Sequence, residues 1–198
     1  MSVLKDSILF IYTLILFVLH AAAFWDLIES GLNSTFNYSK SVYFLLFITS
    51  IQYLDIPFSF FLTRSNPVAV FVQVSGRMLV LYVATQMVGW KHVQFALVGV
   101  YLLSELCRGP FYMANCLRMP CSRLTWLRYN AFKVLYPIGF TCEALVFINV
   151  FFIANRIPID PTNPQFLLTL VFAVVFLCIV NFLYGSMSRK AAQKNKTD

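Results

Sequence analysis

The stretch ILFIYTLILFVLHAAAFWDLIESG, residues 8–31, consists almost entirely of apolar residues. Because an α-helix rises about 1.5 Å per residue, about 20 such residues cross the roughly 30 Å hydrocarbon core of a membrane. The apolar core of a secretory signal peptide is only about 7–15 residues long, and no small-residue cleavage site precedes a soluble body here. This stretch therefore predicts an uncleaved membrane-spanning helix.

Five more apolar runs follow the first, and each is long enough to span a membrane. They lie at 40–63, 68–89, 92–116, 124–154 and 165–186. The shortest joint between them, GWKH at 89–92, predicts a tight antiparallel hairpin. If the two helices were instead one continuous helix, the membrane orientation of every later segment would be inverted. Hydrophobic residues make up 60% of the chain and charged residues only 12%, which excludes a soluble domain. We predict an all-α integral membrane protein, a six-transmembrane-helix bundle that forms a single domain over residues 1–198.

Lysine and arginine are distributed unevenly between the two sides of these six helices. With a cytosolic N-terminus, the cytosolic segments carry Lys5, Arg64, Arg118, Arg123, Arg128, Arg189, Lys190, Lys194 and Lys196, and the opposite side carries Lys40, Lys91 and Arg156. Cytosolic loops of membrane proteins carry an excess of positive charge, so both the N- and C-termini are predicted to be cytosolic. The net charge of +7 then faces anionic membrane lipid, and we expect no nucleic-acid partner.

Two kinds of short motif fit this orientation and suggest the endoplasmic reticulum membrane. The segments NST at 33–35 and NYS at 37–39 are glycosylation sequons in the first loop, which the charge distribution places in the lumen. Lys194 and Lys196 resemble the dilysine signal that returns membrane proteins to the endoplasmic reticulum, and a basic, solvated tail is the alternative. We predict a multi-pass protein of that membrane.

The cysteines and histidines do not form a metal-binding pattern. Cysteine occurs at positions 107, 116, 121, 142 and 178, without a C-x-x-C pair or a matching histidine spacing. His20 and His92 fall on different predicted helices, toward opposite ends of any site. The chain also lacks a glycine-rich phosphate loop. We therefore expect neither a metal nor another cofactor.

Several polar side chains lie inside the predicted helices, where a charge buried in hydrocarbon costs about 2.5–3.5 kcal/mol. At about 100° per residue they fall on one face of each of three helices, which predicts a shared polar interior. The set consists of Gln73 and Arg77 on the third helix, Tyr101, Glu105, Arg108 and Tyr112 on the fourth, and Tyr129, Lys133, Tyr136 and Glu143 on the fifth.

These polar residues differ in predicted depth. Arg77, Arg108 and Lys133 lie about 14 Å from the cytosolic ends of their helices, and Tyr136 and Glu143 lie deeper. This arrangement predicts a cavity with a basic mouth and a tyrosine–glutamate pair at its inner end. In a site of low polarity, such a pair is suited to general acid–base catalysis.

Simpler structural roles remain open for each group. Glu105 and Arg108, three residues apart on one helix, could form only a neutralised pair that fixes helix packing. Lys133 lies near enough to the interface to snorkel into it. Tyr136 and Glu143 could serve packing alone, although no positive residue one turn away on their own helix explains the glutamate.

The segment LRYNAFKVLYPIGFTCE, residues 127–143, resembles the signature of the 3-hydroxyacyl-CoA dehydratases of very-long-chain fatty acid elongation, a family once labelled protein tyrosine phosphatase-like. That signature reads approximately L-R-Y-x-x-F-x-x-L-Y-P-x-G-x-x-x-E, and every fixed position is present here. The resemblance maps the family's catalytic tyrosine and glutamate onto Tyr136 and Glu143. The lesser matches are QVSGR at 73–77, similar to Q-V-x-S-R, and Glu105, Arg108, Phe111 and Tyr112, similar to W-S-x-x-E-x-x-R-Y-x-F-Y.

The chain departs from the family pattern at a few positions. Tyr101 and Leu102 stand in place of the Trp-Ser of the fourth helix, and Gly109 in place of the tyrosine after the arginine. Asp55 and Phe58 stand where a Leu-Glu-x-x-His pattern of the second helix would put glutamate and histidine. Because the tyrosine–glutamate pair is intact, the resemblance implies a divergent but active enzyme.

The resemblance implies a lyase of lipid metabolism, a very-long-chain (3R)-3-hydroxyacyl-CoA dehydratase. It would remove water to give the trans-2-enoyl-CoA in the third step of the fatty acid elongation cycle. Tyr136 would act as base and Glu143 as acid, although the sequence does not separate the two roles. The expected partners are the acyl-CoA substrate, membrane lipid and the other membrane enzymes of the cycle. The substrate-binding or supporting residues would be Arg77, Glu105, Arg108, Tyr129, Lys133, Tyr112 and Gln73.

Two other classes of function remain open. A catalytically weak or inactive scaffold of the elongation complex would keep the fold and lose the chemistry. A small transporter would use the same buried charges for a polar solute, but the sequence shows no inverted repeat or paired broken helices.

Overall fold

The computed structural model describes residues 2–63, 67–119, 121–158, 160 and 162–194, and all regular structure in these residues is helical, as predicted. α1 covers Ser2–Leu32. A second rod combines α2 (Tyr38–Ile51), the 3-10 turn η1 (Gln52–Leu54), α3 (Asp55–Pro57) and the π-helix η2 (Phe58–Thr63). The rest of the chain forms α4 (Pro67–Ala84), α5 (Lys91–Cys116), α6 (Ser122–Ile148), which continues as the π-helix η3 (Asn149–Ala154), and α7 (Pro164–Lys194).

Within the described residues, 4 segments are long and apolar enough to cross a membrane. They are Leu4–Leu32, Tyr38–Phe61, Pro67–Ala84 and Ser122–Ala154. α5 is not among them, and α7 contributes only a shorter apolar stretch, Pro164–Cys178. Each of the six predicted ranges nevertheless falls mainly on one helical rod, in the predicted order. The all-helical membrane class is therefore confirmed, whereas the six crossings stay a prediction.

The joint between the third and fourth predicted helices is a real break in helical structure. α4 ends at Ala84, earlier than the predicted position 89, and α5 begins at Lys91. Gly89 in this turn has a φ of +82°, a left-handed conformation that glycine adopts readily. Beyond the turn the two helices do not form the tight hairpin expected, because α5 packs mainly along α1 and α6, whereas α4 packs on α2 and α6.

Asn149, fully buried at the start of η3, fixes this turn. Its Oδ1 accepts a hydrogen bond from the Val88 backbone N at 3.0 Å, and its Nδ2 donates to the Val88 carbonyl at 3.1 Å. Gln94 Nε2 donates to the Ala84 carbonyl at 3.0 Å, at the end of α4 where backbone acceptors lose their helical partners. The turn is thereby tied to α5 and to the end of α6.

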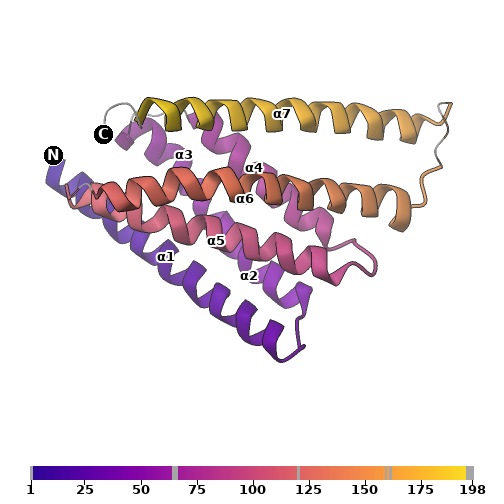
Figure 1. Ribbon diagram of the computed structural model, residues 1–198, viewed down its shortest axis with the longest axis horizontal. Coiled ribbons are helices and arrows are strands. Elements are labelled where there is room, and N and C mark those ends of the chain that lie inside the picture. The colour runs from indigo at the N-terminus through magenta and orange to yellow at the C-terminus, as the bar shows by residue number, and fades with distance from the viewer. Residues whose placement is uncertain (1, 64–66, 120, 159, 161, 195–198) are drawn as a thin grey trace.

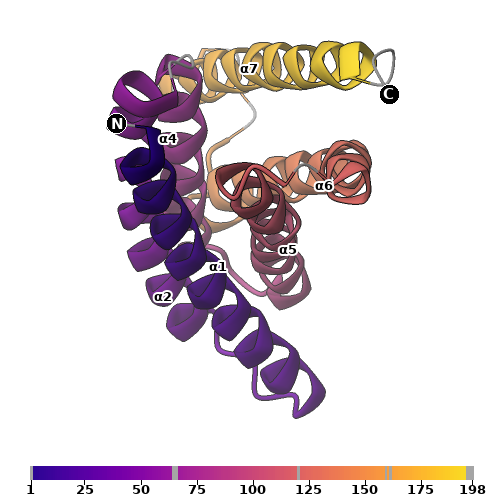
Figure 2. The ribbon, with the colours of Figure 1, turned by 90° about the vertical axis from the view of Figure 1, so that its left-hand side faces the viewer.

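Figures 1 and 2 show how the rods are arranged. α5 packs against both α1 and α6, while α2 and α4 pack against each other on the α1 side of the bundle (Figure 2). α7 runs alongside α6 at the edge of the bundle (Figure 1). The ring of Phe147 in α6 joins the two helices, because its centroid lies 4.7 Å from that of Phe172 and 5.5 Å from that of Phe176. The start of α1 and the end of α7 lie at the same end of the bundle (Figure 1).

One departure from the family pattern has a packing explanation. α5 continues as a helix through Gly109 and Pro110. A Cβ at position 109 would come within 2.8 Å of Phe17 Cδ2 on α1. The glycine therefore lets α1 and α5 approach closely at this level, where a larger side chain would collide with Phe17.

Apolar side chains fill the interior and also cover much of the surface. Leu81, Leu97 and Val146, from three different helices, are fully buried in one core. Leu4 and Leu168, in contrast, are each 70% exposed. An apolar exterior is costly in water and favourable in lipid, so this surface agrees with the membrane class.

Part of the orientation argument rests on side chains outside the described residues. Arg64 and Lys196 lie outside them, as do the side chains of Arg189, Lys190 and Lys194. The cytosolic placement of both ends and the use of the dilysine signal therefore stay predictions.

Candidate functional site

Glu105, in the middle of α5, is the centre of a buried charge network. Its side chain is 8% exposed and pairs with Arg77 of α4. The Nη2 atom of Arg108, one turn away on α5, lies 2.9 Å from Glu105 Oε2 and 3.6 Å from Asp55 Oδ2 of α3. Charges are tolerated in a low-polarity interior only when they compensate one another, as these two arginines and two carboxylates do. The predicted Glu105–Arg108 pair is confirmed, and the structure adds Arg77 and Asp55 to it.

The network continues from Arg77 to α6 through Tyr101. Arg77 Nη2 donates a hydrogen bond to Ser104 Oγ at 3.2 Å, and Arg77 Cζ lies 5.4 Å from the centre of the Tyr101 ring. The Tyr101 hydroxyl donates to Glu143 Oε1 at 2.7 Å. One aromatic ring thus separates the Arg77 guanidinium from the Glu143 carboxyl.

Tyr136 lies on the same face of α6 as Glu143, because seven residues correspond to nearly two helical turns and about 10 Å of rise. Its ring sits between those of Phe132 and Phe140, at centroid distances of 5.3 Å and 5.7 Å. Glu143 on this face is joined through Tyr101 to Arg77 of the network. Tyr136 therefore lies on the side of α6 that faces the network.

Of the other predicted supporting residues, the ring of Tyr112 lies 5.7 Å from Arg108 Cζ and so borders the network, whereas Gln73 and Lys133 form no hydrogen bond or ion pair with it in the described part of the structure. Lys133 is exposed on α6, and Gln73 is half-buried on α4, one turn before the network's arginine. The hydroxyl of Tyr112 is at the surface, where it accepts a hydrogen bond from Arg128 Nη2 at 2.9 Å. The side chain of Tyr129 lies outside the described part of the structure.

The basic mouth expected from Arg77, Arg108 and Lys133 therefore differs from the arrangement in the structure. The two arginines are bound to carboxylates, because an unpaired guanidinium could not be buried at this depth. Lys133 instead has the exposure expected of a lysine that snorkels, the alternative that the sequence left open.

Sequence reasoning missed His20 as a neighbour of the network. It was expected only toward one end of any site, but it is buried on α1, 2% exposed, and interacts electrostatically with Glu105. Its Nδ1 donates a hydrogen bond to the Leu16 carbonyl at 2.7 Å. A polar residue in the middle of the apolar run 8–31 was the available signal, since such residues normally face the bundle interior.

The structure offers no obvious metal centre in the residues it describes. Among them, no group of three or more His, Cys, Asp or Glu side chains is close enough to hold an ion. The acidic side chains of the network already have arginine partners. The chemistry available at this site is that of a phenol, carboxyls and guanidinium groups.

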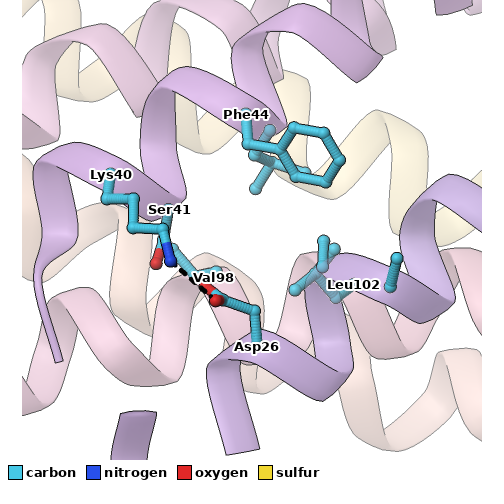
Figure 3. A pocket seen from close by; sticks show the side chains of 9 residues that line it. Asp26, Lys40, Ser41, Phe44, Val98 and Leu102 are labelled. Carbon is cyan, nitrogen blue, oxygen red and sulfur yellow. Dashed lines mark hydrogen bonds and ion pairs between the residues drawn. The ribbon is translucent and has the colours of Figure 1, made fainter. Parts of the chain in front are cut away.

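A recess of about 280 Å³ lies between α1, α2 and α5 (Figure 3). An ion pair between Lys40 Nζ and Asp26 Oδ1, 2.8 Å apart, lies beside it. Its apolar wall includes Phe44, Val98 and Leu102. No residue of the charge network lines it, so the recess is a feature separate from the candidate site.

Relatives of known name cover most of the chain at low identity. A very-long-chain (3R)-3-hydroxyacyl-CoA dehydratase of Gallus gallus is 33% identical over 65% of this chain and 40% of its own length. The corresponding dehydratase 3 of Mus musculus is 28% identical over 98% of this chain and 59% of its own length. A protein of Schizosaccharomyces pombe, named as a probable dehydratase of this type, is 32% identical over 44% of each chain.

The chain spans about half the length of the curated relatives it matches. No solved structure matches it. The family model described as protein tyrosine phosphatase-like protein, PTPLA, matches residues 49–197, which include Asp55, the three network residues of α4 and α5, and the tyrosine–glutamate pair of α6. The chain therefore belongs to the protein tyrosine phosphatase-like (PTPLA) family.

Proposed function

We propose that this protein is a very-long-chain (3R)-3-hydroxyacyl-CoA dehydratase, a hydro-lyase that forms the trans-2-enoyl-CoA in fatty acid elongation. The observation that carries the proposal is the pair on α6: Tyr136 and Glu143 share the face next to the buried charge network, and Glu143 is held by a hydrogen bond. The relatives named above are dehydratases of this class, which supports the same chemistry here.

The reaction needs one group that accepts a proton and one that donates a proton. In our proposal Tyr136 takes the proton from C2, next to the thioester carbonyl, and Glu143 protonates the 3-hydroxyl. The C2–H electron pair becomes the new C2=C3 bond, the C3–O bond breaks, and the oxygen leaves as water. The position of the phenol supports its role, because it shares a face of α6 with Glu143 nearly two helical turns away, so the two groups can act on different atoms of one substrate.

Arg77 and Arg108 have a different role in this proposal from the one suggested by the sequence. Because both are bound to Glu105, they fix α4 and α5 relative to each other and do not present free positive charge to the substrate. Contact with the CoA phosphates falls instead to exposed cations such as Lys133, which lies one turn before Tyr136 on α6.

We further propose six membrane crossings with both termini on the cytosolic side, in the endoplasmic reticulum membrane. An even number of crossings is supported by the common end shared by the start of α1 and the end of α7. In this orientation the cytosolic CoA thioester reaches Lys133 first, and the acyl chain extends between apolar helices. The apolar outer face of α7, which includes Leu168, would contact lipid or the other membrane enzymes of the cycle.

The direct test is dehydration of a very-long-chain (3R)-3-hydroxyacyl-CoA by the full chain in membranes, with Tyr136→Phe and Glu143→Gln as variants. Loss of either proton-transfer group should lower turnover at least about a hundredfold. Tyr82→Phe and Glu29→Gln are matched controls, because both side chains are exposed and lie outside the site, and they should keep normal turnover.

Near-normal turnover in both site variants would overturn the proposed chemistry. A wild-type chain that folds and has no dehydratase activity would instead indicate a scaffold of the elongation complex.

A further inference from the structure

The hydrogen bond between Tyr101 and Glu143 joins two helices at the proposed reaction site. Tyr101 belongs to α5 and is 6% exposed, and its hydroxyl lies 2.7 Å from Glu143 Oε1. Within the described residues, the other carboxyl oxygen of Glu143 has no recorded partner. One oxygen of the proposed acid is therefore held in place, and the other is available to a substrate.

Tyr101 is itself fixed by two further contacts. The guanidinium of Arg77 lies against its ring, and Ser104 Oγ donates a hydrogen bond to its backbone carbonyl at 2.8 Å. The same Ser104 Oγ accepts a hydrogen bond from Arg77. The guanidinium restricts the ring, and Ser104 links the backbone of Tyr101 to Arg77, so the phenol can impose a direction on the carboxyl that it contacts.

Tyr101 is also a position at which this chain departs from the family pattern, which has tryptophan there. In this chain the result is a second phenol at the site. Tyr136 lies nearly two turns of α6 away from the glutamate, whereas Tyr101 touches it directly. The two phenols therefore have distinct geometries and need not share one role.

We propose that Tyr101 is a positioning residue for Glu143: it holds Oε1 so that Oε2 faces the 3-hydroxyl of the substrate. This inference rests on the proposed dehydratase function. A glutamate side chain has several rotatable bonds, and without the hydrogen bond its carboxyl would occupy several directions. Turnover then falls because fewer molecules have the oxygen in reach of the leaving group.

The test is Tyr101→Phe, which removes only the hydroxyl. We expect kcat to fall about ten- to a hundredfold, the loss typical of a small misplacement of a reacting group, with KM unchanged. Tyr38→Phe is the matched control: Tyr38 is 8% exposed, and its hydroxyl donates to the Leu81 carbonyl at 3.2 Å. This control removes a similarly buried phenol hydroxyl that bonds to a backbone carbonyl rather than to Glu143, and it should leave kcat unchanged.

A second measurement separates positioning from a general structural effect. Glu143→Asp shortens the side chain by one methylene and breaks the same hydrogen bond from the other side. If Tyr101 acts through Glu143, adding Tyr101→Phe to Glu143→Asp should cause little further loss, whereas a structural effect would lower the rate equally in both backgrounds. If Glu143→Asp has no measurable activity, the kcat and KM of Tyr101→Phe, compared with those of Tyr38→Phe, decide between positioning and a structural effect. Rates are normalised to the folded protein recovered from detergent.

Failure of this inference differs from failure of the proposed function. If Tyr136→Phe and Glu143→Gln are inactive while Tyr101→Phe has the same kcat as Tyr38→Phe, the positioning role alone is refuted. An equal loss for Tyr101→Phe in both Glu143 backgrounds also refutes it. If Tyr136→Phe and Glu143→Gln retain activity, the dehydratase chemistry itself is wrong.

Discussion

Two ion pairs of nearly equal length illustrate how differently two regions of this bundle are built. Lys40 and Asp26 lie 2.8 Å apart beside the recess between α1 and α2, with side chains 73% and 46% exposed. Arg108 and Glu105 lie 2.9 Å apart on α5, with side chains 25% and 8% exposed. The distance between the charges is almost the same, so it cannot tell the two pairs apart.

Burial decides what each pair contributes. Solvent screens an exposed pair, and the two side chains lose conformational freedom when they meet, so its net effect on stability is small. A buried carboxylate is different because it has lost its water, and each of its partners depends on it. The buried pair is therefore the one whose disruption should affect both folding and the proposed activity.

The largest effect should come from Glu105→Gln. This change leaves the guanidiniums of Arg77 and Arg108 without their shared carboxylate, and breaking a buried ion pair from one side typically costs about 3–5 kcal/mol. We expect a strongly lowered melting temperature in detergent and loss of dehydratase turnover. A melting temperature within error of the wild type would show that Glu105 does not stabilise the fold by compensating the charges of Arg77 and Arg108.

The sequence predicted the faces of the helices but not the partners across them. Periodicity correctly put Glu105 beside Arg108, because residues three apart on a helix are neighbours whatever surrounds them. The contact of Tyr101 with Glu143 depends on the way α5 packs against α6. No spacing within one chain segment encodes that contact, so it could not be predicted.

Depth was the less reliable part of the sequence argument. Lys133 is at nearly the same predicted level as Arg77, yet its side chain is exposed, while that of Arg77 is only 13% exposed and pairs with Glu105. Whether such a side chain is buried depends on whether a counterion faces it from a neighbouring helix. Glu105 of α5 faces Arg77 in this way and does not face Lys133. His20 was misplaced for a related reason, because the packing of α1 along α5 was unknown.

A neutral buried contact separates the effect of burial from that of charge. Asn149→Leu removes both hydrogen bonds to Val88, which lies in the turn between α4 and α5. The backbone N–H and carbonyl of Val88 then lose their partner. Unsatisfied buried groups of this kind cost about 1–3 kcal/mol, so the free energy of unfolding should fall by less than in Glu105→Gln. Thermal unfolding of the two variants in the same detergent gives the comparison. If Asn149→Leu lowered the free energy of unfolding more than Glu105→Gln, charge would not be the reason that the network is costly to break.

The smallest effect should come from Lys40→Gln at the exposed pair. Its partner Asp26 remains hydrated when the ammonium is removed, so no buried charge is created. We expect an unchanged melting temperature at physiological salt and, at most, a small decrease at low salt, where screening is weakest. Thermal unfolding at two salt concentrations, with Asp26→Asn and the double variant, measures any coupling between the two side chains. A salt-independent loss as large as that of Asn149→Leu would contradict the comparison, because it would require the Lys40–Asp26 pair to be shielded from water.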